Sequence, residues 1–196
     1  ESGTMSTDLS DAGLLIEHPY LNSPFDYTGP SLTGIIPANT VDFILIELRQ
    51  GPGSNNLLIA QQVAFVLTNG DIVLEDGSLP RFTVNQASTY QIWLRHHNHL
   101  DVFSDEEVVP AAQVVKDFLH PDDVAGPEQL TPVGNDIYAM FSGDVNQDGT
   151  INVSDYNSWK IDPAIINVYT TSDMNLDGSV QTTDYDVWFE NRAKIG

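Results

Sequence analysis

The chain has 196 residues and a formal net charge of −21, because 28 acidic residues face seven basic ones, and 41% of its residues are hydrophobic, enough for a core. The charge excludes nucleic acid as a partner, since phosphate must be neutralised by Lys and Arg, and it disfavours anionic membrane surfaces while attracting cations. The lack of cysteine excludes disulfides and cysteine-ligated metals, and the lack of a long apolar run predicts no membrane span.

The first 30 residues are rich in turn-forming residues and allow only a short helix at 7–15. The chain begins at Glu1 rather than at Met, which suggests a processed protein or an excised fragment. From Val41 onward, β-branched and apolar runs alternate with Gly, Asn, Asp and Pro. These runs predict strands at 41–49, 57–67, 70–77, 81–84, 89–97 and 136–143.

The first predicted strand, VDFILIELR, is mostly apolar, so we expect it to be partly buried on both faces. The glutamines of the second, LLIAQQVAFVL, indicate a bend or bulge, and 120–135 reads as a surface loop. The close spacing of the strands favours an antiparallel β-sandwich, Ig-like or jelly-roll-like, over βαβ units. We expect this sandwich to occupy residues 1–142.

Two acidic stretches near the end of the chain share one pattern. DVNQDGTINVSD runs from Asp144 to Asp155, and DMNLDGSVQTTD runs from Asp173 to Asp184, an offset of 29 residues. The offset continues past each loop, where a Tyr and a Trp lie three residues apart on one helical face. This internal duplication predicts two helices that pack through Tyr156, Trp159, Tyr185 and Trp188.

The pattern of each stretch suits calcium. Ca²⁺ takes about six to eight oxygen ligands, which a twelve-residue loop supplies from positions 1, 3, 5, 7, 9 and 12, with Gly at position 6 for the turn. Mg²⁺ suits the loops less well, because it prefers a tighter octahedron. Position 8, Ile151 or Val180, should point inward and pair across the loops. The predicted ligands of two Ca²⁺ ions are Asp144, Asn146, Asp148, Thr150, Asn152, Asp155, Asp173, Asn175, Asp177, Ser179, Gln181 and Asp184.

Two details separate these loops from an ordinary EF-hand: position 12 is Asp rather than Glu, and a predicted strand precedes the first loop. Loop–helix duplicates of this kind resemble the type I dockerin repeat, the calcium-binding half of cohesin–dockerin pairs in extracellular polysaccharide-degrading assemblies. The resemblance covers 143–196 and implies a small α module there, which we expect to dock rigidly on the β-sandwich.

In dockerins of the cellulosome type, positions 10 and 11 commonly carry a Ser/Thr pair that contacts cohesin. The residues at these positions, and so the candidate partner-binding residues, are Val153, Ser154, Thr182 and Thr183, of which only the second pair fits the family pattern. The link between the loops, IDPAIINVYTTS, is not typical of dockerins either.

The region before the loops, including PANTVDFILIELRQ and DIYAMFSGDVNQDG, is similar to uncharacterised C-terminal regions of secreted or surface proteins of Bacteroidetes-like bacteria. This resemblance implies an extracellular or cell-surface location and a non-catalytic module. An apolar strand usually precedes the segment matching SGTMSTDL in that family. The resemblance therefore implies a sheet that lacks a strand, or gains one from another chain by β-augmentation.

The segment RHHNHL brings three histidines together. In a strand, His97 and His99 would share a face and could bind a transition metal. The alternative is a structural cluster at a strand end, in which His96, His97 and His99 form hydrogen bonds with nearby backbone.

No nucleophile elbow or glycine-rich phosphate loop is present, so we expect no enzyme, and a hydrolase is the weakest of our hypotheses. We expect a calcium-stabilised structural or adhesive module, such as a subunit of a surface layer or filament completed by strand exchange. The alternative is a dockerin-type module that attaches to a cohesin-like partner or a polysaccharide-degrading assembly. A polysaccharide ligand is left open.

Overall fold

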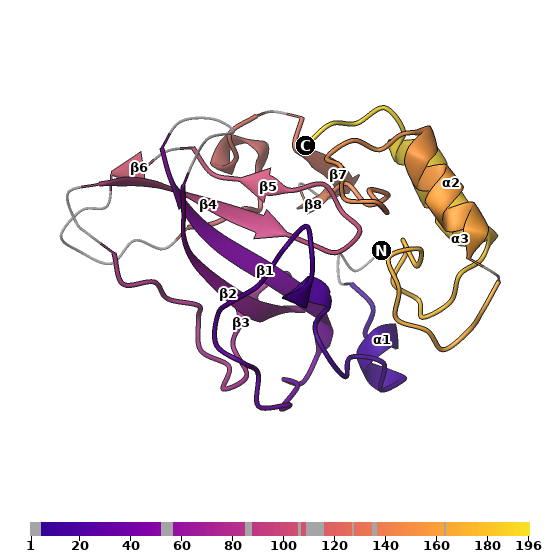
Figure 1. Cartoon of the computed structure of the whole chain (residues 1–196), viewed down its shortest axis with the longest axis horizontal. Coiled ribbons are helices and arrows are strands. Elements are labelled where there is room, and N and C mark those ends of the chain that lie inside the picture. The colour runs from indigo at the N-terminus through magenta and orange to yellow at the C-terminus, as the bar shows by residue number, and fades with distance from the viewer. Residues whose placement is uncertain are drawn as a thin grey trace.

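The computed structural model describes residues 5–51, 57–84, 88–105, 107–108, 116–126, 128–134, 137–162 and 164–196. The fold is mainly β, with a curled antiparallel sheet and few helices (Figure 1). Six strands form this sheet in the order β3–β2–β1–β4–β5, and β6 pairs with β4. Their bounds are β1 Thr40–Gln50, β2 Leu57–Leu67, β3 Ile72–Val73, β4 Thr89–Arg95, β5 Val102–Phe103 and β6 Glu107–Val108.

Strand β1 lies at the centre of the sheet and is buried on both faces, more fully than its mostly apolar sequence predicts. One face packs Phe43 and Leu45 against the N-terminal segment, which contributes Leu9 and Tyr20 among others. The opposite face forms a second cluster of side chains from the sheet and from segments that follow it. That cluster contains Ile44, Ile46, Ala64 and Leu94, with Phe82, Phe118 and Met140 packed against it.

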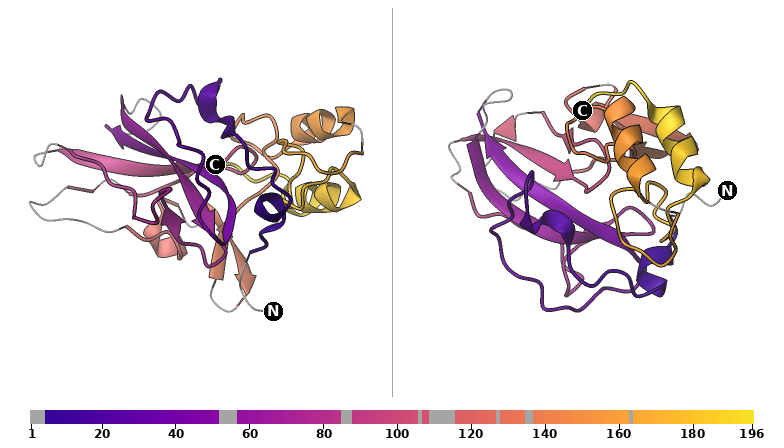
Figure 2. Two further views of the ribbon diagram at one scale, coloured as in Figure 1. Left: turned by 90° about the horizontal axis from the view of Figure 1, so that it is seen from below. Right: turned by 45° about the vertical axis from the view of Figure 1, so that its right-hand side comes forward.

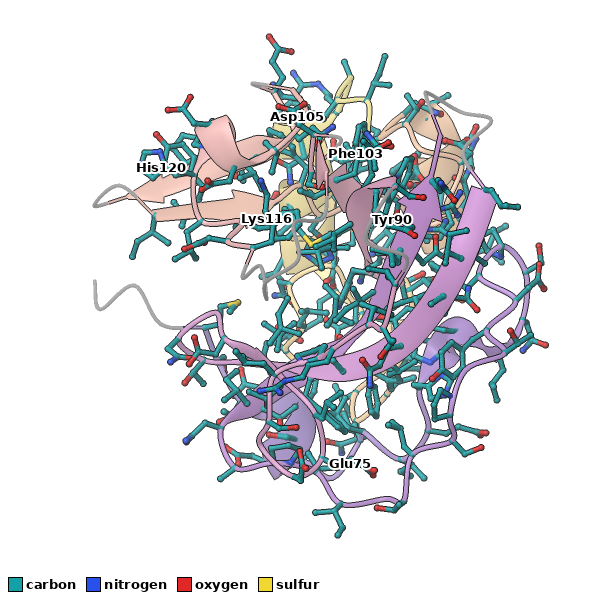
Figure 3. The ribbon with its side chains drawn as sticks, turned by 90° about the vertical axis from the view of Figure 1, so that its left-hand side faces the viewer. Glu75, Tyr90, Phe103, Asp105, Lys116 and His120 are labelled. Carbon is teal, nitrogen blue, oxygen red and sulfur yellow. The ribbon has the colours of Figure 1, made fainter. Side chains whose placement is uncertain are left out.

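From residue 5 onward, the N-terminal segment covers the sheet without adding a strand to it. These described residues form only the helix α1 (Asp8–Asp11) and the 3₁₀ turn η1 (Pro19–Leu21), because the prolines among them lack the N–H that a sheet ladder requires. Its attachment is polar as well as apolar. Glu75 Oε1, in the turn after β3, accepts N–H bonds from Thr33 at 2.6 Å and Gly34 at 2.9 Å (Figure 3).

A second sheet is the two-stranded hairpin of β7 (Leu130–Gly134) and β8 (Ile137–Met140), which follows the 3₁₀ turn η3 (Pro121–Asp123). The expected mainly β, antiparallel fold is therefore confirmed. The described strands form one large sheet and one two-stranded hairpin. They therefore match the predicted antiparallel β class but not the detail of two large packed sheets. Residue 136, the predicted start of the last strand, lies outside the described residues.

Several sequence predictions need correction. No strand forms at 81–84, where Pro80 removes a ladder donor just before the segment, although Phe82 still packs into the core. The strand predicted at 70–77 is reduced to β3, and the loop predicted at 120–135 contains β7. The irregularity expected at the glutamines of β2 lies beside them, opposite Leu48 and Arg49, where the register shifts.

The two longest helices are α2 (Val153–Ile161) and α3 (Thr182–Asn191), which lie side by side at one end of the molecule (Figure 2). The acidic loops precede them and lie between the helices and the large sheet (Figure 1). No helix in the described part of the chain is long and apolar enough to cross a membrane.

Candidate metal-binding loops and their anchor

The first position of each acidic loop organises the turn that follows it. Asp144 and Asp173 are almost fully buried, and both oxygens of each carboxylate accept backbone N–H bonds. The donors are Asp148 and Gly149, both at 3.0 Å, in the first loop, and Asp177 at 3.1 Å and Gly178 at 2.8 Å in the second. The glycines have φ of 81°, a left-handed conformation that explains why position 6 is Gly.

The twelfth position closes each loop from the first turn of its helix. Asp155 and Asp184 are fully buried, and each carboxylate reaches back to N–H groups at both ends of its loop. The donors are Asn146 at 3.1 Å and Asn152 at 2.8 Å for the first loop, and Met174 and Gln181, both at 2.7 Å, for the second. Both aspartates are the third residue of their helix.

The remaining predicted ligands take matching places in the two loops. The position-3 amides, Asn146 and Asn175, donate to the position-5 carboxylates at 3.0 and 2.9 Å. Asn152 caps α2, since its Oδ1 accepts the Ser154 N–H at 2.7 Å, and its Nδ2 donates to the Thr150 carbonyl at 3.1 Å. Its side-chain oxygen is thus engaged by the helix. Ser179 and Gln181 occupy the same places in the second loop.

The loops hold more negative charge than their own hydrogen bonds satisfy. Burial raises the pKa of Asp144 to about 6 and that of Asp173 to about 7, and the carboxylates of Asp155 and Asp184 add to the rise. Asp177 Oδ1 is buried and has no hydrogen-bond partner among the described residues. A crowded set of oxygens with an unpartnered carboxylate atom fits the donor set that Ca²⁺ requires.

The aromatic residues of the duplicated helices meet as predicted. The Tyr156 ring centroid lies 5.9 Å from that of Tyr185 and 5.3 Å from that of Trp188, and Trp159 lies 5.8 Å from Tyr185. The indole N–H of Trp188 also donates to the Asn152 carbonyl at 2.8 Å, which ties α3 to the first loop. The four rings are half-buried rather than enclosed.

The inward residues at position 8 do not pair across the loops, and this prediction was wrong. Ile151 N–H donates to the Lys194 carbonyl at 2.9 Å, and Val180 N–H donates to the Ile165 carbonyl at 2.8 Å. Lys194 and Ile165 are again 29 residues apart, so each loop pairs with the segment that follows the other loop's helix. The isolated bridges Thr150–Ile195 and Ile166–Ser179 repeat the exchange. These pairings use the backbone N–H groups of Ile151 and Val180, which a direct pair between the two loops would require.

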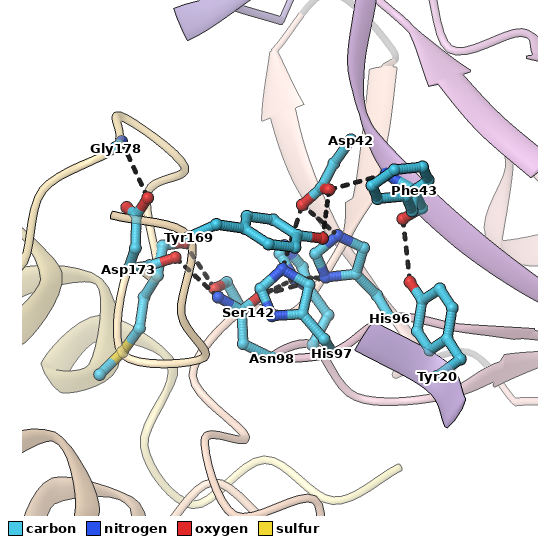
Figure 4. Close-up of polar contacts among 12 residues, drawn as sticks. Tyr20, Asp42, Phe43, His96, His97, Asn98, Ser142, Tyr169, Asp173 and Gly178 are labelled. Carbon is cyan, nitrogen blue, oxygen red and sulfur yellow. Dashed lines mark hydrogen bonds and ion pairs between the residues drawn. The ribbon is translucent and has the colours of Figure 1, made fainter. Parts of the chain in front are cut away.

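Asn98 connects the strand-rich part of the chain before Gly143 (the β domain) to both loops at once. Its carbonyl accepts the N–H groups of Gly143 at 2.9 Å and Asp144 at 3.1 Å, and its Nδ2 donates to the Asp173 carbonyl at 2.7 Å (Figure 4). Asn98 is completely buried. The first residue of each loop is therefore held by one residue of the turn that follows β4. Ser142 Oγ reinforces the contact by donating to the Met174 carbonyl at 2.7 Å.

A buried carboxylate lies beside this anchor. Asp42 Oδ2 is 3.0 Å from His96 Nε2 and 3.1 Å from His97 Nε2, while Oδ1 accepts the Phe43 N–H and the Tyr169 hydroxyl, both at 2.7 Å (Figure 4). Burial alone would raise the pKa of Asp42, but hydrogen bonds from the two histidines hold the pKa well below its usual value. Tyr169 comes from the link between the acidic loops, so this cluster is a second junction.

The histidine prediction is corrected in one respect. Strand β4 ends at Arg95, so the histidines lie in a turn, and His97 and His99 do not share a strand face. His96 and His97 converge on Asp42 instead, while His99 Nδ1 lies 2.7 Å from Asn98 Oδ1. Burial, and then the charge on His96, lower the pKa values of His97 and His99.

The sequence offered faint signals for the residues it missed. Asp42 is an acid near the start of a mostly apolar predicted strand, and Tyr169 lies in the link that departs from the dockerin pattern. The candidate partner-binding residues occupy corresponding places in the two duplicated helices. Val153, Ser154, Thr182 and Thr183 are all exposed, in the first turns of α2 and α3.

Comparison with known proteins does not assign the chain to a family. No protein-family model matches it, and no curated protein matches it either. A solved structure of a C-terminal interface mutant of a type II cohesin–X–dockerin complex from Acetivibrio cellulolyticus aligns with a TM-score of 0.41 and 16% identity, over 76% of this chain and 81% of that one. A match this weak establishes no shared fold, so the dockerin-like reading rests on the loops themselves.

Proposed function

We propose that the chain is an extracellular, non-enzymatic structural module in which two Ca²⁺ ions keep the acidic loops in the shape that clamps the β domain. The observation that carries the proposal is Asn98, which holds the first residues of both loops. Bound calcium would offset most of the negative charge of the crowded carboxylates, and it would give Asp177 Oδ1 a partner. In the first loop the ion would be held by Asp144, Asn146, Asp148, Thr150, Asn152 and Asp155, and in the second by Asp173, Asn175, Asp177, Ser179, Gln181 and Asp184.

Extracellular calcium is sufficient for this role. Extracellular modules bind Ca²⁺ with dissociation constants of about 10⁻⁴–10⁻³ M or tighter, within reach of millimolar calcium. At millimolar calcium, a site with a dissociation constant of about 10⁻⁴ M contributes about 1.4 kcal/mol to the free energy of unfolding. Two such sites would form a substantial part of a typical domain's stability.

Thermal unfolding with calcium and with a calcium chelator tests the proposal. We expect a higher melting temperature in calcium, and little of that gain with magnesium at the same concentration. The double variant Asp148→Asn, Asp177→Asn tests the loops directly, because it keeps the size of both side chains while removing one charge from each loop. Its calcium-dependent gain should be much smaller. Equal melting temperatures of the wild-type protein in calcium and in chelator would refute the clamp.

A further part of the proposal is self-association through the outer edge of β2. In the described part of the chain, β3 is the only strand on that edge, and it pairs only with Phe65 and Val66. Toward its start, β2 exposes Leu57, Leu58 and Ile59, by 64%, 41% and 41%. No residue of β2 is charged, so two copies can pair along this edge without the repulsion expected elsewhere on so acidic a chain.

Light scattering across a concentration series measures this association. We expect a dimer or larger assembly that Ile59→Lys dissociates, because the added charge opposes pairing of two copies. Ile16→Lys is the control, since Ile16 is 86% exposed in the N-terminal segment. A wild-type monomer at all concentrations, or equal loss with both variants, would exclude this edge.

The alternative function is dockerin-type attachment to a cohesin-like partner. The exposure of the four residues Val153, Ser154, Thr182 and Thr183 favours it, because they remain free to contact another protein while the loops hold the β domain. Binding to an immobilised cohesin in calcium, lost in chelator and in the variant Thr182→Ala, Thr183→Ala, would support this function. No binding to type I or type II cohesins would leave the structural role.

A further inference from the structure

Three buried side chains from two separate segments point ligand atoms at one place. Among the residues that the structure describes, Asp42, His96 and His97 form the group whose carboxylate oxygen and imidazole nitrogens all lie within 4.8 Å of one another. The three residues are 1%, 4% and 2% exposed. Burying three titratable groups together is costly unless each is paired with another group or an ion.

The spacing suits a small divalent transition metal. Asp42 Oδ2 lies 3.0 Å from His96 Nε2 and 3.1 Å from His97 Nε2. Around a tetrahedral Zn²⁺ with bonds of about 2.0–2.1 Å, neighbouring ligand atoms lie about 3.3 Å apart. The carboxylate oxygen and each imidazole nitrogen would need to separate by only a few tenths of an ångström, and all three ligand atoms lie within 4.8 Å of one another. Two imidazoles and one carboxylate also suit zinc better than calcium, because calcium favours oxygen ligands alone.

The surrounding groups orient the ligands as zinc sites require. A histidine that binds metal through Nε2 carries its proton on Nδ1 and needs an acceptor there. For His96 the acceptors within reach of Nδ1 are His99 Nδ1 at 2.8 Å and Asn98 Oδ1 at 3.1 Å. Asn98 Oδ1 faces the ring because Asn98 Nδ2 donates to the Asp173 carbonyl. The second oxygen of Asp42 is fixed by the Phe43 N–H and the Tyr169 hydroxyl, so Oδ2 is left for an ion.

We propose that Asp42, His96 and His97 bind one Zn²⁺ ion. The site differs from the acidic loops in location and in its nitrogen donors, and it does not depend on the proposed calcium sites. It would join β1 to the turn after β4. Through Tyr169 and Asn98 it would also fix the junction with the acidic loops.

Metal analysis after equilibrium dialysis tests the proposal on the full chain. Protein first stripped with a chelator is dialysed against micromolar Zn²⁺ in saturating Ca²⁺, so that calcium occupies the oxygen-rich loops. We expect about one zinc per chain for the wild type. His97→Gln should lower zinc affinity at least about tenfold, since Gln keeps an N–H donor for Asp42 but removes the imidazole ligand. His120→Gln should bind like the wild type, because His120 is exposed, packs on Tyr138 and is not one of the three clustered residues (Figure 3 labels His120).

X-ray absorption of the zinc-loaded wild type provides a test that does not depend on the folding of any variant. We expect two imidazole nitrogens in the zinc coordination shell, with oxygen in the remaining positions. No zinc retained at micromolar concentration would overturn the proposal and leave a cluster held by hydrogen bonds alone. Zinc coordinated only by oxygen, or equal binding by the wild type and a folded His97→Gln, would overturn it too.

Discussion

The side-chain amide of Asn98 donates a 2.7 Å hydrogen bond to the carbonyl of Asp173, the residue that opens the second acidic loop. The carbonyl of Asn98 at the same time accepts the N–H of Asp144, which opens the first loop. A single buried residue of the β domain therefore sets the distance between the first positions of both loops. Any change that loosens either loop acts on the same contact.

Replacing Asn98 by Ala should destabilise the protein by about 1–3 kcal/mol, because the buried carbonyl of Asp173 loses its donor. Urea unfolding in calcium measures the change in the free energy of unfolding. Asn157→Ala, at an exposed position of α2, is the control and should stay within about 0.5 kcal/mol of the wild type. Equal effects of the two substitutions would show that Asn98 is not an anchor.

The acidic loops could be predicted because their information is local. Gly149 and Gly178, the alternating acids and the twelfth-position Asp all act within a dozen residues. The anchor could not be found in this way. Asn98 and Asp173 are 75 residues apart in the chain, and Asp42 and Tyr169 are 127 apart, so only the folded chain brings them together.

The fold shows the same division. Strand β1 could be predicted from its mostly apolar, β-branched sequence, which fits a strand buried on both faces. The two-residue strands β3 and β5 are too short to leave a pattern. The cover over one face of the sheet was missed because irregular segments bury Leu9 and Tyr20 without any periodicity.

Asp177→Asn should remove tight calcium binding at the second loop and spare the first. The change leaves the side chain in place but removes the charge beside the unpartnered Oδ1, and each carboxylate strongly affects the affinity of such a loop. Isothermal titration calorimetry should count two calcium ions for the wild type and one tight site for the variant. Asp162→Asn, beyond the end of α2, should keep both sites, and two unchanged sites in Asp177→Asn would contradict the assignment.

The calcium-free protein should lose stability through Asp173 as the pH rises. Burial raises the pKa of this carboxyl from 3.8 to about 7 in the folded protein, so between these values the folded state holds a proton that the unfolded chain has released. The free energy of unfolding then falls with increasing pH. Urea unfolding in chelator should show this trend for the wild type relative to Asp173→Asn. The free energy of unfolding of the wild type minus that of Asp173→Asn should therefore decrease as the pH rises. A value that stays constant or increases would contradict the raised pKa.

Tyr169 and Asp42 should show a favourable coupling across the junction. Tyr169→Phe removes a hydroxyl that donates to the buried carboxylate at 2.7 Å, and a hydrogen bond to a charged group contributes about 1.5–3 kcal/mol. Tyr169→Phe, Asp42→Asn and the double variant form a double-mutant cycle that isolates the pair. The unfolding experiments use zinc-free buffer with calcium. Strictly additive effects would mean that the two residues do not interact.

Ile151 links the first loop to the β domain through apolar contact, and its truncation should be costly. Its side chain is completely buried with Leu100 and Phe141, and Trp188 of the second helix packs against the same cluster. Ile151→Ala should therefore lower the free energy of unfolding by about 2–5 kcal/mol, the range for a large-to-small change in a packed core. Ile166→Ala, at a position 72% exposed, should change it by less than about 0.5 kcal/mol. Because the cluster joins both halves of the chain, we expect a single unfolding transition for each variant in calcium, and two separate transitions would mean that the loops unfold independently of the sheet.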